Sequence, residues 1–387
     1  MISFRWALLV PIVSSFQPTI PTQYHLSSSS GTNVNLSAEA TTTASSETIP
    51  LLSEEDTTDD RSTTLTLLEH VNFNVPNHDY ILDFYLRVLG CGLDPKVACN
   101  LMPDTDESFG RTGLIWATCG PNQFHLPRGE IGQSLPGHIG LRYRSLDNLK
   151  KRLELEIKDN NNNKCIESYE IVKDNDSNEI VIIKDRYGTI FYCREGAEKL
   201  TQYRHSFVKS SETDKYGDVA VKYGMEEETD CRGIDYVEFN CKKGIAKKIA
   251  AFYESVLDVA ATVIEEDGTI VALIGFGDVD NKSCYPQYMK FRETSEEIPA
   301  YDGHHLAIYV GENMNDFEDA FHKVDRAGII STNWRDKIDA TTIETARQVN
   351  QFRFQTIFDI ETNETIFELE HEIRSVEFPT FPGKRRK

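Results

Sequence analysis

One structural unit recurs four times along this 387-residue chain, and the repeat constrains the fold more than any other feature. In each copy, a short segment that alternates polar and apolar residues precedes a segment with apolar residues at helical spacing. The alternating segments begin at His70, His138, Tyr236 and His305. The interval between the first two starts nearly equals that between the last two, and each half is offset from the other by an almost constant interval. This regular spacing predicts a duplicated pair of units.

The helical segments each carry an amphipathic stripe, followed by room for three further strands. In the third copy, the stripe consists of Ile249, Phe252, Tyr253, Val256 and Leu257. The final strands are the clearest, and they read "QFHLP" from Gln123, "TIFYCRE" from Thr189, "QYMKF" from Gln287 and "TIFELEHE" from Thr365. Each unit is therefore predicted to be a βαβββ module, in an α+β fold of four tandem modules.

Four motifs in register give the chain a family resemblance from residue 67 to residue 375. They are "EHVNFNV…FYLRVLG", "GHIGLRY", "DRYGTIFYCRE" and "ELEHEIRS". With these motifs the chain resembles the vicinal oxygen chelate (VOC) superfamily, which includes glyoxalase I, bleomycin-resistance proteins, extradiol dioxygenases and methylmalonyl-CoA epimerase. The resemblance implies paired modules that curl into a concave sheet, with metal ligands on the first and last strands of the modules.

The repeat and the composition between its copies predict two VOC domains. The expected segments are a signal and transit segment at 1–48, an acidic linker at 49–66, domain 1 at 67–200, a polar linker at 201–232, domain 2 at 233–376 and a basic tail at 377–387. The "DNNNNK" run from Asp159 is expected to be a loop inside domain 1. Because modules can pair within the chain, a monomer is compatible with this organisation.

The segment at 1–48 differs in composition from the rest of the chain. Arg5 precedes an apolar run that ends at Val13, small residues follow, and the next stretch is rich in Ser and Thr with only Glu39 and Glu47 as acids. This pattern is typical of a signal peptide followed by a transit segment. The "SSFQPT" junction resembles bipartite plastid presequences, so plastid delivery through the secretory route is expected, with secretion or endomembrane retention as the alternative.

Composition excludes several classes of partner. The formal net charge is −21, which disfavours nucleic acid, and the only compact basic run is the terminal "KRRK". No stretch approaches the roughly 20 apolar residues of a membrane span. The eight cysteines form no Cys-x-x-Cys pair and are expected to be ordinary buried thiols. The VOC resemblance implies a small-molecule substrate or ligand as the partner.

The candidate site residues follow from strand alternation, since the polar face of each first and last strand does not pack on the helices. The eight expected positions are His70, His125, His138, Tyr192, Tyr236, Lys290, His305 and Glu368. Five of them carry an imidazole or a carboxylate, the groups that bind divalent zinc, nickel, iron or manganese. Glu370 shares the face of Glu368 and is a candidate general base, and Glu368 is the other catalytic candidate.

The grouping of these residues depends on how the modules pair, and two arrangements are open. If neighbouring modules pair, His70, His125, His138 and Tyr192 form one site. If the first module pairs with the fourth, as in single-chain glyoxalases, the site holds His70, His125, His305 and Glu368. The second arrangement is favoured because it yields one complete site and one degenerate site, the latter with His138, Tyr192, Tyr236 and Lys290.

The sequence departs from the ligand patterns of both named reactions. His125 occupies the position of the first Glu of a glyoxalase I, and Tyr192 or Tyr236 interrupts the two-His, one-Glu set of a ring-cleaving dioxygenase. Two hypotheses remain. One is a divalent-metal enzyme acting on a small carbonyl, enolisable or phenolic substrate. The other is a metal-free binding or sequestering protein of the bleomycin-resistance type that uses Tyr192, Tyr236 and Arg142.

Overall fold

The computed structural model describes residues 63–94, 114–158, 165–174, 176–196, 230–277, 287–332, 339–379 and 381. The expected presequence at 1–48, the "DNNNNK" loop, the terminal "KRRK" run and most of the linkers at 49–66 and 201–232 lie outside these residues. Among the helices that are described, none is long and apolar enough to span a bilayer.

The strands form two mixed sheets. The seven-stranded sheet has the order β14 (Gln351–Phe358), β15 (Thr365–Ser375), β13 (His305–Val310), β1 (Leu65–Asn72), β4 (Asn122–Pro127), β3 (Leu114–Cys119) and β2 (Gly92–Leu93). The eight-stranded sheet has the order β10 (Ala261–Glu266), β11 (Thr269–Phe276), β12 (Gln287–Thr294), β9 (Cys231–Lys242), β5 (Gly137–Tyr143), β8 (Ile190–Glu195), β7 (Glu179–Asp185) and β6 (Ile166–Lys173).

The helices confirm the predicted stripes. They are α1 (His78–Ile81) continuing into the π-helix η1 (Leu82–Val88), α3 (Asp147–Lys158), α6 (Ala246–Phe252) continuing into the π-helix η3 (Tyr253–Leu257), α7 (Met314–Arg326) and α8 (Ile343–Val349). All five predicted apolar residues of the third unit are buried. Helix α7 begins at an Asn313 capping box, in which Asn313 and Asp316 satisfy each other's backbone N–H groups.

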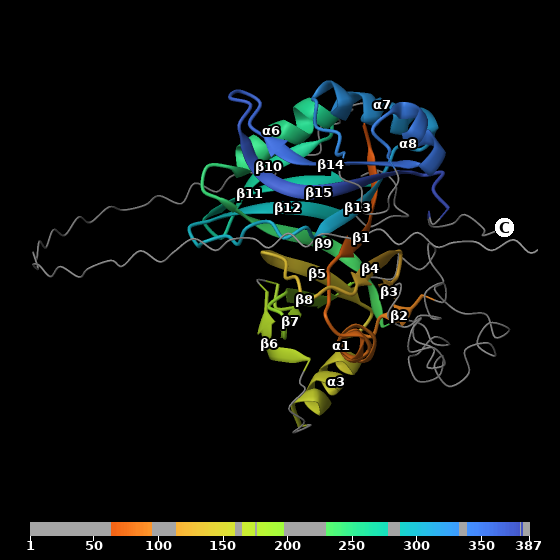
Figure 1. The fold of residues 1–387 in the computed structure, drawn as a ribbon. Helices are drawn as coiled ribbons and strands as arrows, with labels where there is room; N and C mark the ends of the chain where they lie inside the picture. The colour runs from red at the N-terminus through yellow and green to blue at the C-terminus, as the bar shows by residue number, and fades with distance from the viewer. Residues whose placement is uncertain are drawn as a thin grey trace, which may run out of the picture. The chain divides into compact units, whose positions relative to one another are not determined.

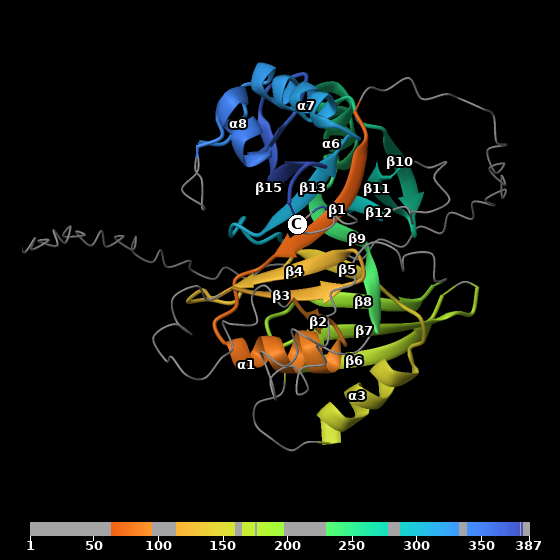
Figure 2. The ribbon, with the colours of Figure 1, turned by 90° about the vertical axis from the view of Figure 1, so that its right-hand side faces the viewer.

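Each sheet joins modules from both halves of the chain. β1 pairs antiparallel with β13, so the first module pairs with the fourth, and β5 pairs antiparallel with β9, so the second pairs with the third. Helices α1 and α3 nevertheless lie together at one end and α6, α7 and α8 at the other (Figure 1), and Figure 2 shows the same separation from the side. The boundary expected at 201–232 therefore separates the helices but not the sheets, since strand pairing crosses it twice.

Three of the four units follow the βαβββ pattern. The fourth differs within its described residues, where α7 and α8 precede only two full strands, β14 and β15. An isolated antiparallel bridge between Ile330 and Phe354 lies on the other side of β14. The α+β class and the tandem modules are confirmed, with this departure in the last module.

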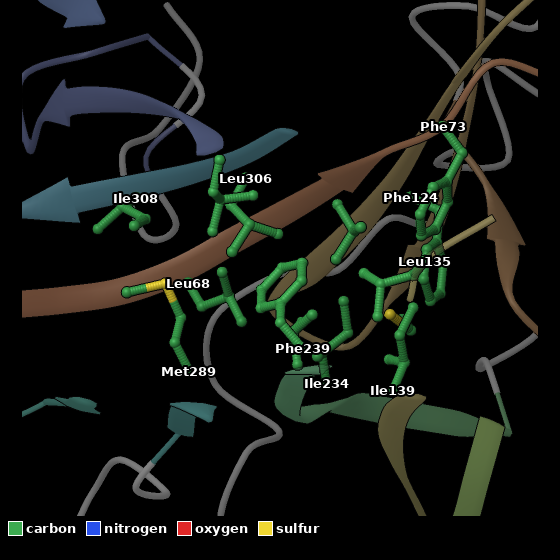
Figure 3. Packing of buried hydrophobic residues seen from close by; sticks show 14 of the residues in the cluster. Leu68, Phe73, Phe124, Leu135, Ile139, Ile234, Phe239, Met289, Leu306 and Ile308 are labelled. Carbon is green, nitrogen blue, oxygen red and sulfur yellow. The ribbon is translucent and has the colours of Figure 1, made fainter. Parts of the chain in front are cut away.

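The hydrophobic core lies where the two sheets face each other. Leu68, Leu306 and Ile308 come from the seven-stranded sheet, and Ile139, Phe239 and Met289 from the eight-stranded sheet, in one buried cluster (Figure 3). Along β1 and β13 these apolar residues use one face of the strand, so the histidines use the other. Burial of this face at about 25 cal/mol per Å² of apolar surface stabilises the register that places the polar positions.

Candidate functional site

The polar positions of the four modules are structurally equivalent, as strand register shows. His70 on β1 lies opposite Gln123 on β4, and His125 is two residues further along. His305 on β13 lies opposite Glu370 on β15, and Glu372 is two residues further along. Successive side chains alternate between faces, so a step of two residues returns to the same face. Glu372 is therefore the fourth-module counterpart of His125.

The seven-stranded sheet brings three predicted histidines together. The rings of His70 and His125 stack with centroids 3.6 Å apart, and those of His70 and His305 are 5.7 Å apart. His70, His305 and Glu372 each offer a ligand atom, and these atoms lie within 4.8 Å of one another. All four side chains are buried. His125 stacks on Trp116 as well, and it lies outside the three-residue ligand group.

Glu368, the expected carboxylate, does not join this group. It is exposed and accepts a hydrogen bond from Gln355 at 3.0 Å. The cause is strand register: β13 pairs with β15 only from Glu370 to Ser375, whereas Glu368 pairs with Thr356 on β14, beyond the start of β13. Four residues along a strand correspond to about 13 Å, so the prediction placed the carboxylate at the wrong position along β15, whose register with β14 also shifts between Glu368 and His371.

A β-bulge in β1 adds a residue that alternation does not predict. The register with β13 shifts between Leu68 and His70, and Glu69 falls within this irregularity. Glu69 is fully buried, and its Oε2 lies 3.3 Å from His70 Nδ1. A carboxylate accepts from the Nδ1–H tautomer, which leaves the lone pair on Nε2. The Nε2 atom of His70 is buried with no hydrogen-bond partner among the described residues.

Two arginines hold the carboxylates around this group. Arg353 donates from Nη2 to Glu372 Oε2 at 2.5 Å and from Nη1 to Glu370 Oε1 at 2.6 Å. Arg374 donates from Nε to Glu372 Oε1 at 2.5 Å and forms a second ion pair with Glu69. Three carboxylates and two guanidinium groups leave one net negative charge beside the histidines, which suits a cation.

The surroundings keep the imidazoles neutral and Glu372 ionised. Burial lowers the pKa of His70 to about 4, and burial also lowers the pKa values of His125 and His305. Burial alone would raise the pKa of Glu372, but Arg353 and Arg374 outweigh it and hold that pKa well below its usual range. Neutral imidazoles and an ionised carboxylate are the protonation states in which these groups bind metals.

The tautomer of His125 follows from its neighbours. Gln123 donates from Nε2 to Asp94 Oδ2 at 2.8 Å, so its Oε1 faces His125 Nε2 at 3.1 Å. An amide oxygen only accepts, so His125 carries its proton on Nε2 and its lone pair on Nδ1. Gln123 and Asp94 are thus positioning residues that the sequence pattern did not single out.

The eight-stranded sheet gathers the four residues expected at the degenerate site. His138 Nε2 lies 3.0 Å from the Tyr236 hydroxyl, and the rings of His138 and Tyr192 are 4.2 Å apart. Lys290 Nζ lies 4.5 Å from the centroid of the Tyr236 ring. Because His138 and Tyr192 belong to this sheet, the alternative ligand set of His70, His125, His138 and Tyr192 does not form.

Glu370, the expected general base, is buried in the seven-stranded sheet next to the histidines. Its carboxylate is held by Arg353, and its backbone N–H donates to the Tyr301 hydroxyl at 3.1 Å. Arg353 thus already occupies one oxygen of this carboxylate. The geometry therefore gives Glu370 a positioning role through Arg353.

Comparison with known proteins gives distant structural similarity alone. No family model matches the sequence, and no curated protein matches it. Among solved structures, a putative dioxygenase from Bacillus subtilis has 14% identity over 81% of this chain and 86% of its own, with a TM-score of 0.47. A glyoxalase I mutant from Zea mays has 12% identity over 82% of this chain and 95% of its own, also with a TM-score of 0.47.

The strand order itself establishes the fold, in which two first strands meet antiparallel at the centre of each sheet. This is a VOC fold. At such low identities, the activity has to be argued from the residues of this chain.

Proposed function

We propose that this VOC protein is a divalent-metal-dependent enzyme acting on a small oxygenated substrate, with its metal site on the seven-stranded sheet. The observation that carries the proposal is the buried Nε2 of His70, which has a lone pair and no partner among the described residues, beside His305 and Glu372. Leaving such an atom unsatisfied costs about 1 to 3 kcal/mol, which a bound ion would recover. Zinc, nickel, iron and manganese all accept this donor set.

The geometry of the donor atoms fits one ion. His305 Nε2 lies 3.5 Å from Glu372 Oε2. Two ligands of a tetrahedral ion with bonds of about 2.0 to 2.1 Å are roughly 3.3 Å apart, so this pair needs little adjustment. Glu69 accepts a hydrogen bond from Nδ1–H of His70 and so fixes the tautomer that leaves Nε2 available as a ligand. Carboxylates outside the ligand set commonly do this at metal-bound histidines.

The remaining residues would orient substrate and accept a proton. A bound divalent ion supplies Lewis-acid chemistry, polarising oxygens of a carbonyl, enolisable or phenolic substrate. His125, stacked on His70, is the neighbouring neutral imidazole, and its Nδ1 lone pair can accept a proton or complete the ligand set. Arg353 and Arg374 keep Glu372 ionised and in place.

One observation favours the alternative, a metal-free binding or sequestering protein. Both oxygens of Glu372 already accept hydrogen bonds from guanidinium groups, which competes with metal coordination. In that case the face around Tyr192 and Tyr236 would hold the ligand, with Lys290 and Arg194 positioned over the Tyr236 ring.

Metal analysis discriminates the two functions. Protein purified without chelator is analysed directly and after addition of zinc, nickel, iron(II) or manganese, alongside the double variant H70Q/H305Q and the matched control H138Q. We expect close to one equivalent of ion that is lost in H70Q/H305Q and retained in H138Q. If no added ion binds, the metal-free binding protein is favoured. If the double variant binds the ion as the parent does, the site at His70 and His305 is wrong.

Delivery to plastids is likewise a proposal, supported by the composition of residues 1–48. Fusion of residues 1–47 to a fluorescent reporter tests it. Plastid fluorescence is expected, and cytosolic fluorescence would contradict it.

A further inference from the structure

Three buried cysteines from separate parts of the chain converge at a second place in the molecule. Cys91 lies just before β2, Cys119 ends β3 and Cys231 begins β9. Each is at most 4% exposed, and their sulfur atoms lie within 4.8 Å of one another. The sulfur of Cys231 therefore has the thiols of Cys91 and Cys119 as close neighbours. The three cysteines are far apart in sequence and match no metal-binding motif.

The backbone holds these three segments together independently of the sulfurs. Asp230 N donates to Gly90 O at 3.1 Å, and Cys231 N donates to the same oxygen at 3.4 Å. Gly120 has a φ of +54°, and a Cβ placed there would lie 2.0 Å from Arg232 O, so only glycine permits this close approach. The three cysteines are therefore preorganised, and they link the seven-stranded sheet to β9 of the eight-stranded sheet.

The geometry points to a binding site for a thiophilic metal ion formed by Cys91, Cys119 and Cys231. Metal–sulfur bonds of about 2.3 Å in a planar three-coordinate site place the sulfurs roughly 4 Å apart, which is within the observed spacing. The group contains three donors and no fourth His, Cys, Asp or Glu among the described residues. Zinc prefers four ligands, whereas copper(I) is soft and accepts three thiolates, so copper(I) is the probe that fits best.

A nearby cation would offset the charge of such a site. Arg152 binds Val88 O through Nε at 2.9 Å and pairs with Asp230 through Nη1. Its Nη2 is buried, has no hydrogen-bond partner within the described part of the chain, and would lie 2.7 Å from a Cβ on Gly90, next to Cys91. A thiolate site that forms here would give this N–H group a negatively charged neighbour.

Binding requires no oxidation. Three S–H bonds release their protons to solvent, three metal–sulfur bonds form, and the ion keeps its oxidation state. Because the sulfurs are buried, the ion has to enter while the chain folds. By joining segments of both sheets, the ion would stabilise their association, as structural metal ions do in folding.

The test uses the full-length chain, refolded anaerobically with one equivalent of copper(I) and titrated with a competing copper(I) chelator. Variants C119S and C231S are compared with the matched control C193S, whose thiol is equally buried but lies outside the group. The parent and C193S are expected to hold one copper with a sulfur-only shell in X-ray absorption. C119S and C231S are expected to hold it at least tenfold more weakly.

Two further measurements keep the inference independent of the histidine site and of misfolding. The H70Q/H305Q variant should bind copper(I) as the parent does, and copper(I) should raise the unfolding midpoint of the parent but not of C119S. Circular dichroism of the metal-free variants establishes that they fold, and C91S replaces any that does not. Copper bound through nitrogen, equal retention by C119S, or a disulfide between two of these cysteines in the native protein would each overturn the site.

Discussion

The two sheets carry the same four strand positions but different chemistry. In the seven-stranded sheet these positions hold His70, His125, His305 and Glu372, and in the eight-stranded sheet they hold His138, Tyr192, Tyr236 and Lys290. The backbone frame is shared, since in every module the last-strand residue stands two places beyond the partner of the first-strand residue. The backbone therefore brings the side chains at these four positions together in both sheets. The charge of those side chains then decides whether the group attracts or repels a cation.

The position held by Glu372 in one sheet and by Lys290 in the other shows the contrast most directly. Glu372 places a carboxylate between two guanidinium groups, whereas Lys290 places an ammonium group over the Tyr236 ring. A divalent ion beside Lys290 would meet a like charge at close range. Metal chemistry is thus proposed for one sheet only.

The largest expected difference concerns stability. E372A removes the carboxylate that Arg353 and Arg374 share and leaves both guanidinium groups in a buried setting. Breaking a buried pair in this way costs about 3 to 5 kcal/mol. K290A, at the equivalent position, loses only a cation–π contact worth about 0.5 to 1 kcal/mol. Urea unfolding of both variants measures this, and equal losses would show that the charged network around Glu372 does not stabilise the fold.

The next prediction concerns the stability of the protein at low pH, to which the histidines of the two sheets should contribute alike. Burial lowers the pKa of His70 to about 4 and that of His138 to about 3, from about 6.5 in an unfolded chain. Between these values the unfolded chain binds the proton and the folded protein does not, so stability falls as pH drops below 6.5. Each histidine should contribute up to about 3 kcal/mol to the loss by pH 4.5.

Metal-free H70Q and H138Q provide the measurement for this acid effect. Each should lose less stability between pH 7 and pH 4.5 than the parent does. A parent whose unfolding free energy is the same at both values would mean that these rings are protonated equally in the folded and unfolded chain.

A smaller effect is expected from the carboxylates behind the two histidines. E69Q weakens the partner that fixes the His70 tautomer, so metal affinity should fall by about 10- to 100-fold, as it does for outer partners of metal-bound histidines. E238Q makes the matched change beside His138, whose Nδ1 lies 3.4 Å from Glu238, and should leave metal affinity unchanged. Competition with a metal-binding dye measures both, and equal affinities in E69Q and the parent would remove Glu69 from the site.

Sequence periodicity was sufficient to predict the fold class and the residues that gather on each sheet. It indicated the α+β class, the repeated modules and the convergence of His70, His125 and His305, because alternation and register are properties of regular strands. It also named all four residues of the eight-stranded group. Both arrangements of module pairing remained open, because pairing is set by contacts between residues far apart in the chain.

The parts that periodicity missed are irregular or long-range. Glu69 reaches His70 through a β-bulge, which breaks the alternation on which the prediction relied. The three-cysteine group joins strands that are distant in the chain, so spacing alone could not reveal it. Glu372 was missed because glutamates at 368, 370 and 372 follow one another at alternate positions of β15, and only pairing with β13 distinguishes them.

The smallest expected effect tests that distinction among the glutamates. Glu368 is exposed and accepts a surface hydrogen bond from Gln355, so E368A should change the unfolding free energy by no more than about 0.5 kcal/mol. Its metal content should equal that of the parent, because β15 carries this side chain about 13 Å from the position of Glu372. The measurement is the metal content of E368A and of E372Q, each compared with the parent. E372Q keeps the side-chain shape of Glu372 but removes its charge. Loss of metal in E368A with retention in E372Q would reverse the assignment and restore Glu368 as the ligand.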